Sequence, residues 1–209
     1  MDDSEQFISE RFDLVMEFRH GLSLETDRGC ALMAAEYLSA QLAELLQAHF
    51  VDDSKACEAA LEDANGPVST FSSRIEFTYL LGFIGPVARR ELHLIRKIRN
   101  EFAHEYKPLA FENEAIAARC RELRAYTMFP DPSPRANFVR TVMGLLAVVH
   151  SQIAFAKHIE VPEDHLIEVS AEERKEVEER IRGLVKELMS GFTAAREDGR
   201  ADKSPGAKC

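Results

Sequence analysis

Three residues near the middle of the chain, Arg99, Asn100 and His104, have side chains that could act together on a phosphodiester. His104 could serve as general base or acid, Arg99 could stabilise charge that builds on a phosphate, and Asn100 could orient the attacked group. On a helix, Asn100 and His104 are one turn apart and Arg99 adjoins Asn100, so all three can reach one patch. The same residues also fit a solvated helix end, where a cation lies near the negative pole of the helix dipole.

These three residues lie on a predicted helix that begins near Pro86 and ends before Tyr106, Lys107 and Pro108. A buried stripe is expected because positions recur at steps of three and four, the period of an α-helix. That stripe is Val87, Glu91, Leu94, Ile98, Phe102 and Glu105. The other face carries basic residues, of which Arg89, Arg96 and Lys97 are the predicted binding residues beside Arg99.

An acidic cluster, Glu25 and Asp27 with the adjacent basic Arg28, opens another predicted helix. We expect Asp27 or Glu25 to pair with the basic helix and to hold Arg99 in position. The alternative is ordinary acidity at a helix start, which favours the helix dipole without any functional role.

A di-metal carboxylate site is another hypothesis, because Glu17 with His20 and Glu101 with His104 both fit the Glu-x-x-His pattern. Such sites need each pair to project into the core of the bundle, with further glutamates from two other helices. Glu17 and His20 lie on the polar side of their predicted helix. No metal and no cofactor are therefore expected.

The composition predicts a soluble globular protein with a real core, since 45% of its 209 residues are hydrophobic and 30% are charged. The net charge of −10 argues against direct binding to duplex DNA, which needs a concentrated basic face. A local basic groove is compatible with that charge, because residues 89–107 hold six Lys or Arg against three Glu. The four cysteines are widely spaced, the N-terminus lacks a signal sequence, and no apolar run could span a bilayer, so a cytoplasmic location is expected.

Hydrophobic periodicity and turn residues predict an all-α bundle of about seven helices. One domain is expected over residues 1–196, followed by a disordered tail over 197–209, and only residues 166–169 could be extended. The first helix is expected to end where Gly21 and Ser23 occur. Helices are predicted near residues 4–20, 24–50, 54–64, 71–83, 86–105, 111–123, 134–158 and 170–196.

Four segments together resemble the mannitol operon repressor family: residues 25–32, 71–76, 80–82 and 95–104. The resemblance covers roughly residues 25–107, and more loosely the helices to about residue 188. It implies an all-helical transcriptional regulator of sugar-alcohol uptake. Members of that family lack a recognisable DNA-binding module, so the resemblance implies regulation through a protein partner, either another regulator or a phosphotransfer protein.

The segment from Arg99 to His104 is also similar to the Arg-x4-His signature of HEPN (higher eukaryote and prokaryote nucleotide-binding) domains. That similarity implies a helical homodimer in which Arg and His of two protomers face a shared cleft, and metal-independent RNA cleavage. The acidic overall charge departs from this pattern.

The function predicted from the sequence is therefore transcriptional regulation of the mannitol operon repressor type, acting through protein partners. The alternative is a metal-independent ribonuclease or nucleotide-binding protein that uses Arg99 and His104, which leaves open whether the protein is an enzyme.

Overall fold

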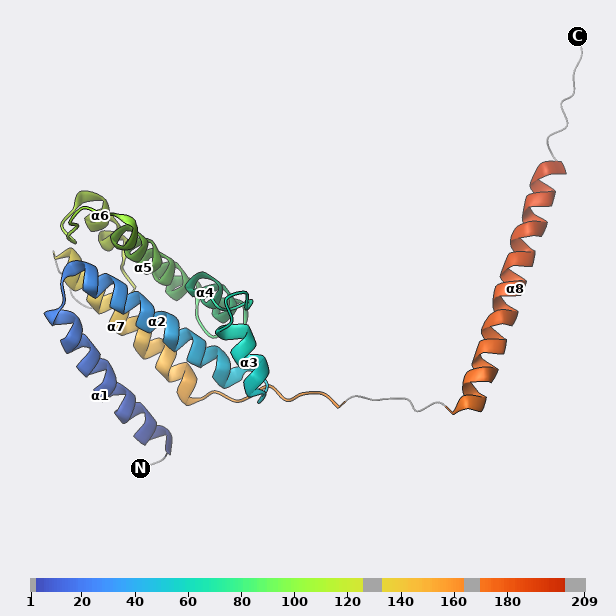
Figure 1. Cartoon of the computed structure of the whole chain (residues 1–209), viewed down its shortest axis with the longest axis horizontal. Helices are drawn as coiled ribbons and strands as arrows, with labels where there is room; N and C mark the ends of the chain where they lie inside the picture. The colour runs from blue at the N-terminus through green and yellow to red at the C-terminus, as the bar shows by residue number, and fades with distance from the viewer. Residues whose placement is uncertain (1–2, 126–132, 164–169, 202–209) are drawn as a thin grey trace, which may run out of the picture. The chain divides into compact units, whose positions relative to one another are not determined.

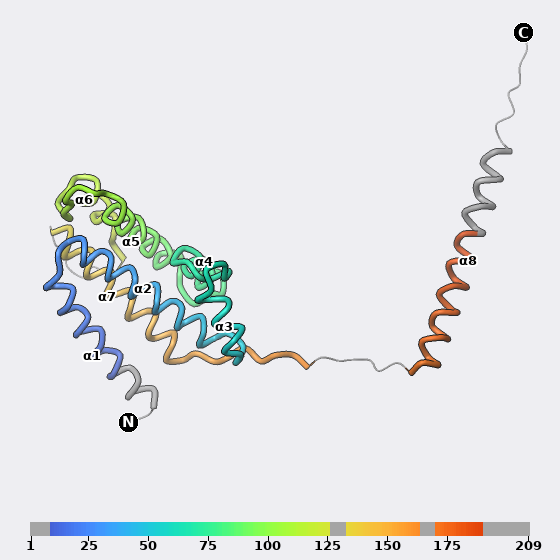
Figure 2. Tube along the Cα trace, in the orientation of Figure 1, coloured from blue at the N-terminus to red at the C-terminus, as the bar shows by residue number. Residues whose placement is uncertain are grey.

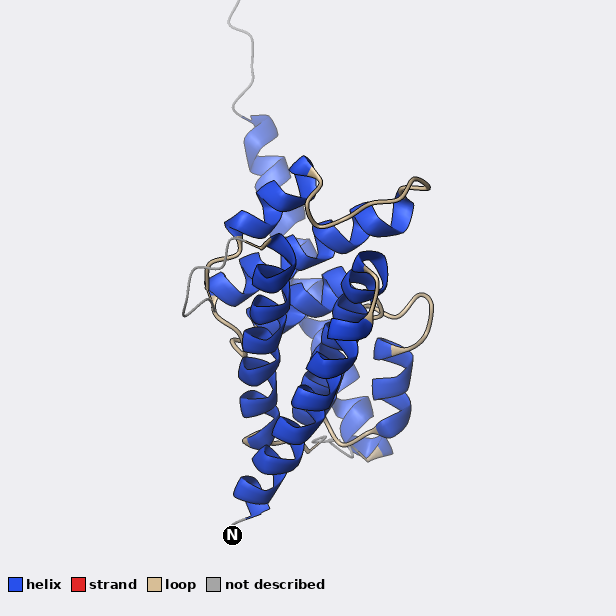
Figure 3. Cartoon of the chain, turned by 90° about the vertical axis from the view of Figure 1, so that its left-hand side faces the viewer, coloured by secondary structure: helices blue, strands red, loops and turns tan. Residues whose placement is uncertain are grey.

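The computed structural model describes residues 3–125, 133–163 and 170–201, and it describes side chains for residues 9–189 within these ranges. Every regular element in them is an α-helix (Figure 3). The predicted all-α class is confirmed, and the described ranges hold eight helices, one in each of the eight predicted ranges. They are α1 (Asp3–Leu24), α2 (Asp27–His49), α3 (Ser54–Leu61), α4 (Phe71–Leu80), α5 (Pro86–His104), α6 (Glu114–Glu122), α7 (Pro134–Ala154) and α8 (Ala171–Ala201).

The chain divides into two units, residues 1–161 and 162–209, and each is described by itself. The first unit holds α1 to α7 and the second holds α8. The prediction of one domain over residues 1–196 stays a prediction. α8 continues to Ala201, past its expected end, and the rest of the predicted tail lies outside the described residues, as do residues 166–169.

α2 is the central helix of the first unit and packs against α1, α4, α5 and α7. In Figures 1 and 2 it lies alongside α1 and α7, with α5 and α4 on the side away from α1. Many of its buried positions are small, which lets neighbouring helices approach closely. The predicted stripe of this helix is confirmed, since all its members are buried: Ala31, Ala35, Leu38, Leu42, Leu45 and Leu46.

The expected end of the first helix near Gly21 is wrong, because α1 continues to Leu24. Leu22 is fully buried in the core of the first unit. Burying a leucine stabilises by about 1.5–3 kcal/mol, whereas a glycine inside a helix costs about 1 kcal/mol. The core contact therefore outweighs the helix-breaking tendency of Gly21.

Capping explains where several other helices begin. The side chain of Thr26 accepts the N–H of Gly29 at the start of α2, and Asp53 accepts the N–H of Ala56 at the start of α3. α6 begins later than expected because Phe111 is fully buried in the core and its N–H bonds to Asp27, which fixes the chain before the helix starts.

An aromatic cluster closes the core at the C-terminal end of α5. Phe111 lies 5.0 Å from Phe102 and 5.1 Å from Phe138, measured between ring centroids. These tilted contacts join α5, the segment before α6, and α7, and so fix the end of the helix that carries the candidate site.

Three cysteines are buried and form no disulfide. Burial raises the pKa of Cys30 to about 11 and that of Cys120 to about 12, so both stay protonated thiols at neutral pH. None of the helices in the described ranges combines the length and the apolar character that crossing a bilayer requires.

Candidate functional site

The site is organised by α5, which begins at Pro86 after the cap residue Gly85. Its buried face is broader than the predicted stripe, because Ala88, Leu92 and Ile95 are also buried. Val87 was predicted to be buried, but it is 53% exposed. Glu91 is fully buried as expected, and its Oε1 forms an ion pair with Nη2 of Arg90 at 2.5 Å.

The opposite side of α5 forms one wall of a polar pocket of about 400 Å³. α2 forms a second wall, and the end of α3 and the start of α4 complete it. The residues that line it with polar side chains are Glu36, Ser39, Glu62, Ser69, Thr70, Ser72, Arg74, Arg96, Arg99 and Asn100. The pocket therefore combines three guanidinium groups with an amide, hydroxyl groups and two carboxylates.

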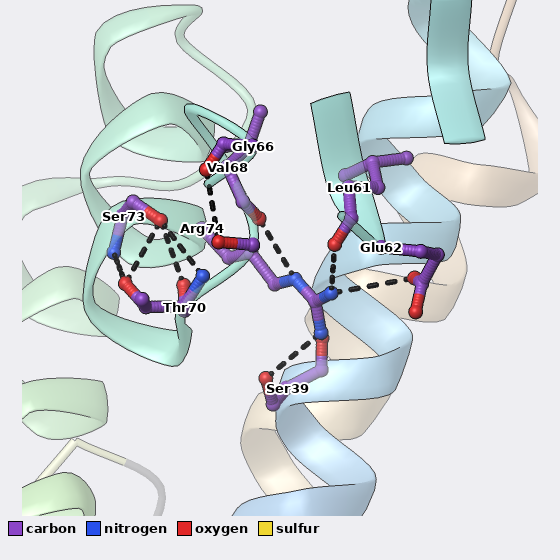
Figure 4. A network of polar contacts seen from close by, with 9 residues as sticks. Ser39, Leu61, Glu62, Gly66, Val68, Thr70, Ser73 and Arg74 are labelled. Atoms are coloured by element: carbon purple, nitrogen blue, oxygen red, sulfur yellow. Dashed lines mark hydrogen bonds and ion pairs between the residues drawn. The ribbon is translucent and has the colours of Figure 1, made fainter. Parts of the chain in front are cut away.

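Arg74 holds the walls of this pocket together (Figure 4). Its side chain is 9% exposed, and all five guanidinium N–H groups have acceptors. Nε donates to the Val68 carbonyl at 3.0 Å, and Nη2 donates to the Leu61 carbonyl at 2.7 Å. The remaining acceptors are the carbonyl and the hydroxyl of Ser39 and, at 3.4 Å, a carboxylate oxygen of Glu62. Arg74 thus joins α2, the end of α3 and α4, and has no donor left for a ligand.

Sequence reasoning missed Arg74 as a site residue, although a signal was present. Arg74 and Thr78 alternate with Phe71 and Ile75 at the spacing of one helical face, and Ile75 and Thr78 are fully buried. A charged residue in such a stripe must find several hydrogen-bond partners in the interior. The capping box between Thr70 and Ser73, with both bonds at 3.1 Å, fixes the start of α4 at the same pocket (Figure 4).

Arg96 and Arg99 differ from Arg74, although they line the same pocket. In the described part of the chain, neither forms an ion pair, and the buried Nε of Arg96 has no hydrogen-bond acceptor. Nη1 of Arg99 donates to Oδ1 of Asn100 at 3.2 Å, which orients the guanidinium and the amide together. Both arginines therefore line the pocket without the ion pair that Arg74 forms with Glu62.

His104 does not line this pocket. It lines a second hollow of about 510 Å³, with Glu101, Glu105 and residues of the segment from Leu109 to Ile116. Glu101 is paired there with Arg119 of α6. The structure thus brings Arg99 and Asn100 together in one pocket and places His104 in another, so a joint catalytic role of all three stays a prediction.

The acidic cluster at the start of α2 has partners other than Arg99. The carboxylate of Asp27 pairs with Arg135 of α7 at 2.7 Å and accepts the N–H of Phe111 at 2.9 Å. Arg135 also donates to the carbonyls of Leu22, at 3.0 Å, and Glu25, at 2.5 Å. Asp27 and Glu25 therefore anchor α7 to the α1–α2 turn, where the sequence predicted support for Arg99.

Arg28 of the same cluster does contact the end of the basic helix. It donates to the carbonyls of Glu105, at 2.6 Å, and Lys107, at 3.1 Å. A cation bound to carbonyls at a helix C-terminus satisfies acceptors that the helix leaves free and favours its dipole.

The other predicted binding residues lie in different surroundings. Arg96 lines the pocket, Lys97 is exposed, and Arg89 pairs with Glu76 of α4 at 2.6 Å while lying 4.6 Å from the ring centre of Tyr79. The hydrogen bond from Arg89, followed by that from a neighbouring histidine, lowers the pKa of Glu76 below its usual value.

No group of three or more His, Cys, Asp or Glu side chains is placed to hold a metal ion within the part of the chain that the structure describes. The two Glu-x-x-His pairs, residues 17–20 and 101–104, thus form no such group in those residues.

The comparisons with known proteins agree with the resemblance noted in the sequence. No family model matches the chain. It is 28% identical over 111 residues to the mannitol operon repressor of Escherichia coli K12, which covers 52% of this chain and 57% of the repressor. The same figures hold for the mannitol operon repressor of Escherichia coli O6:H1. The chain thus matches little more than half the length of these curated relatives.

The fold is similar to that of a chain in the X-ray structure of the MtlR–HPr complex from Escherichia coli. The TM-score is 0.52 at 20% sequence identity, and the match covers 69% of this chain and 99% of that chain. The chain resembles mannitol operon repressors. The HEPN-like motif stays a prediction.

Taken by its chemistry, the pocket suits a compact anion. Guanidinium groups bind phosphate or carboxylate oxygens through paired N–H donors, and the adjacent start of α4 favours negative charge. Glu36 and Glu62 also line the pocket, and their carboxylates disfavour an anion close to them.

Proposed function

We propose that this protein is a transcriptional regulator of the mannitol operon repressor type that acts through contacts with other proteins rather than by reading DNA. Support comes from the sequence similarity to two curated repressors together with the fold match to a chain of the MtlR–HPr complex. The net charge of −10 supports a mechanism without direct DNA binding, since phosphate contacts dominate the affinity of DNA-binding proteins.

The partner we propose is a phosphotransfer protein of the HPr type. The single observation that carries this choice is that the similar fold occurs in a complex with HPr. The partner is thus the second of the two classes that the sequence implied.

A surface for this partner is offered by the turn between α4 and α5. Four large apolar side chains are exposed there: Phe77, Leu80, Leu81 and Val87. Gly82 has a positive φ of 79°, which makes the tight turn that brings the two helix ends together. Exposed apolar groups beside charged side chains such as Arg89 are typical of protein-binding surfaces.

Isothermal titration of the full chain with HPr tests this proposal. We expect saturable binding, weakened about tenfold or more by Leu80→Glu, because a charge at the centre of an apolar contact costs more than 1 kcal/mol. Leu24→Glu is the matched control, since Leu24 and Leu80 are 76% and 75% exposed on different turns. Equal weakening by both variants, or no binding of HPr by the wild-type chain, would contradict the proposal.

A gel shift separates this mechanism from direct repression. We expect no salt-sensitive shift of mannitol operator DNA by the purified protein alone. A specific shift at physiological salt would replace the proposed mechanism with direct DNA binding.

The second candidate function is binding of a nucleotide or another phosphorylated ligand, as the HEPN-like motif implies. The observation that favours it is the pair of pocket-facing guanidiniums of Arg96 and Arg99 without an ion pair in the described residues. Nucleotide titration of the wild type beside Arg99→Ala tests binding. Incubation with RNA and a chelator, beside His104→Ala, tests cleavage, and we expect none.

A further inference from the structure

α8, the longest helix within the described residues, carries a stripe of exposed apolar side chains. α8 extends over Ala171–Ala201, and six of its large apolar side chains are exposed by 53–62%: Val177, Ile181, Leu184, Val185, Leu188 and Met189. The helix start is capped in both directions, since Ser170 and Glu173 exchange bonds of 2.8 and 3.2 Å. A well-defined amphipathic helix of this length gains its stability by burying its apolar face.

The spacing of this stripe is that of a coiled coil. Val177, Ile181, Leu184 and Leu188 follow one another at steps of four, three and four, which is a heptad repeat. In heptad letters, Ile181 and Leu188 occupy a positions, and Val177 and Leu184 occupy d positions. About two heptads therefore present one narrow apolar seam to a partner helix.

The charges beside the seam identify the partner. In an antiparallel pair of identical helices, Val177 packs against Leu188 of the second copy and Ile181 packs against Leu184. This register sets Arg180 opposite Glu187 of the second copy, and by symmetry the pair occurs twice. The helix is thus complementary in charge to a reversed copy of itself.

The parallel arrangement is disfavoured by the same residues. There, positions g and e of successive heptads face each other, which sets Glu173 beside Glu178 of the second copy. Like charges at these positions repel, and the repulsion also occurs twice. Arg180 would then face Val185 and gain no partner.

We propose that α8 pairs antiparallel with α8 of a second copy of this chain, through the seam of Val177, Ile181, Leu184 and Leu188 and two symmetric Arg180–Glu187 ion pairs. The inference is independent of the proposed function, because it uses no residue of the pocket or of the α4–α5 turn. A dimer held in this way would present two copies of each partner-binding surface, and so would raise the avidity for any partner that is itself multivalent.

Sedimentation equilibrium of the full chain over a wide concentration range tests the pairing. We expect a reversible dimer, and a monomer for Ile181→Glu, which introduces a charge into the seam. Circular dichroism of the variant checks that α1 to α8 stay helical. A wild-type chain that stays monomeric at all concentrations, because α8 lies on its own bundle or is uncovered, would overturn the proposal.

A charge-swap series tests the orientation without touching the apolar seam. Arg180→Glu and Glu187→Arg should each raise the dimer dissociation constant about tenfold, because two attractive pairs become repulsive. The double variant should restore the wild-type constant, since it rebuilds both pairs with reversed signs.

Two variants on the outer face of α8 are the matched controls for this series. Lys186→Glu and Glu179→Arg make the same changes of charge at positions that lie outside the seam. We expect them to leave the dissociation constant nearly unchanged. A dimer that is insensitive to Arg180→Glu, or equally weakened by Lys186→Glu, would overturn the antiparallel pairing.

Discussion

The two sides of the polar pocket both carry arginine, but the arginine on one side is fully hydrogen-bonded to the protein and the two on the other side form no ion pair in the described residues. On the α4 side, Arg74 is buried and all five of its donors are bonded to acceptors of α2, the α3 end and the α3–α4 segment. On the α5 side, Arg96 and Arg99 line the same pocket, and Nε of Arg96 has no hydrogen-bond acceptor in the described residues. This comparison indicates that a guanidinium can bind a ligand only where its N–H donors are not already bonded to the protein.

The largest expected effect is on the saturated side of the pocket. Arg74→Ala leaves the carbonyls of Leu61 and Val68 without their donors in a buried setting, and should lower the free energy of unfolding by about 3 kcal/mol. Urea denaturation measures this loss. Arg96→Ala is the matched control, and a loss as large for Arg96→Ala would remove the contrast between the two sides.

A second saturated cluster should behave like Arg74, with a smaller effect. Asp27→Ala removes the acceptor of Arg135 and of the Phe111 N–H, and should cost about 2 kcal/mol of unfolding free energy. Glu25→Gln is the control, because Arg135 bonds to the backbone carbonyl of Glu25, which the substitution keeps. Equal losses for both variants in urea denaturation would show that charge at the helix start, and not the ion pair, stabilises this turn.

The unsaturated side of the pocket should matter for ligands and little for folding. Arg99→Ala should change the unfolding free energy by less than about 1 kcal/mol, because Arg99 donates a partly buried hydrogen bond to its neighbour Asn100. The same variant should abolish any binding of inorganic phosphate that the wild type shows in a calorimetric titration. Phosphate binding that survives in both Arg99→Ala and Arg96→Ala would locate the anion elsewhere.

The smallest expected effect is a dependence of stability on pH at a buried histidine. Burial, followed by the nearby Arg11 guanidinium, lowers the pKa of His150, whose Nε2 lies 2.5 Å from Oε1 of Gln41. The unfolded chain therefore binds a proton at this histidine near the ordinary pKa of about 6.5, whereas the folded chain binds it only at lower pH. The contribution of His150 to the free energy of unfolding is therefore fully present above that pH and is lost as the pH falls below it.

Urea denaturation at pH 7.5 and pH 5.5 detects the histidine effect. His150→Gln should lose less stability between these two conditions than the wild type does. His20→Gln, at an exposed position of α1, should follow the wild type. Identical pH dependence in all three proteins would assign the acid sensitivity to other groups.

Much of the fold could be predicted because it is encoded in local periodicity. The stripe of α2 and the starts of α3 and α5 follow from apolar spacing and from start signals such as Asp53 and Pro86. The end of α1 could not be predicted locally, since Gly21 is overruled by the burial of Leu22 in a core built by distant helices.

The site was predicted only as far as one helix can specify it. Adjacency along α5 predicted that Arg99 and Asn100 lie together, and the structure has a hydrogen bond between their side chains. The choice of Arg135 by Asp27 joins residues far apart in the chain, and the pocket depends on Arg74 reaching Ser39 of α2. Such tertiary contacts leave no spacing signal along one helix, so the separation of His104 from Arg99 was not foreseen.

The most direct test of the central claim is a calorimetric titration of the full chain with HPr in the absence of DNA. The account predicts saturable binding that Leu80→Glu weakens and Leu24→Glu does not. No heat of binding with HPr, together with specific binding of the protein to operator DNA, would contradict it.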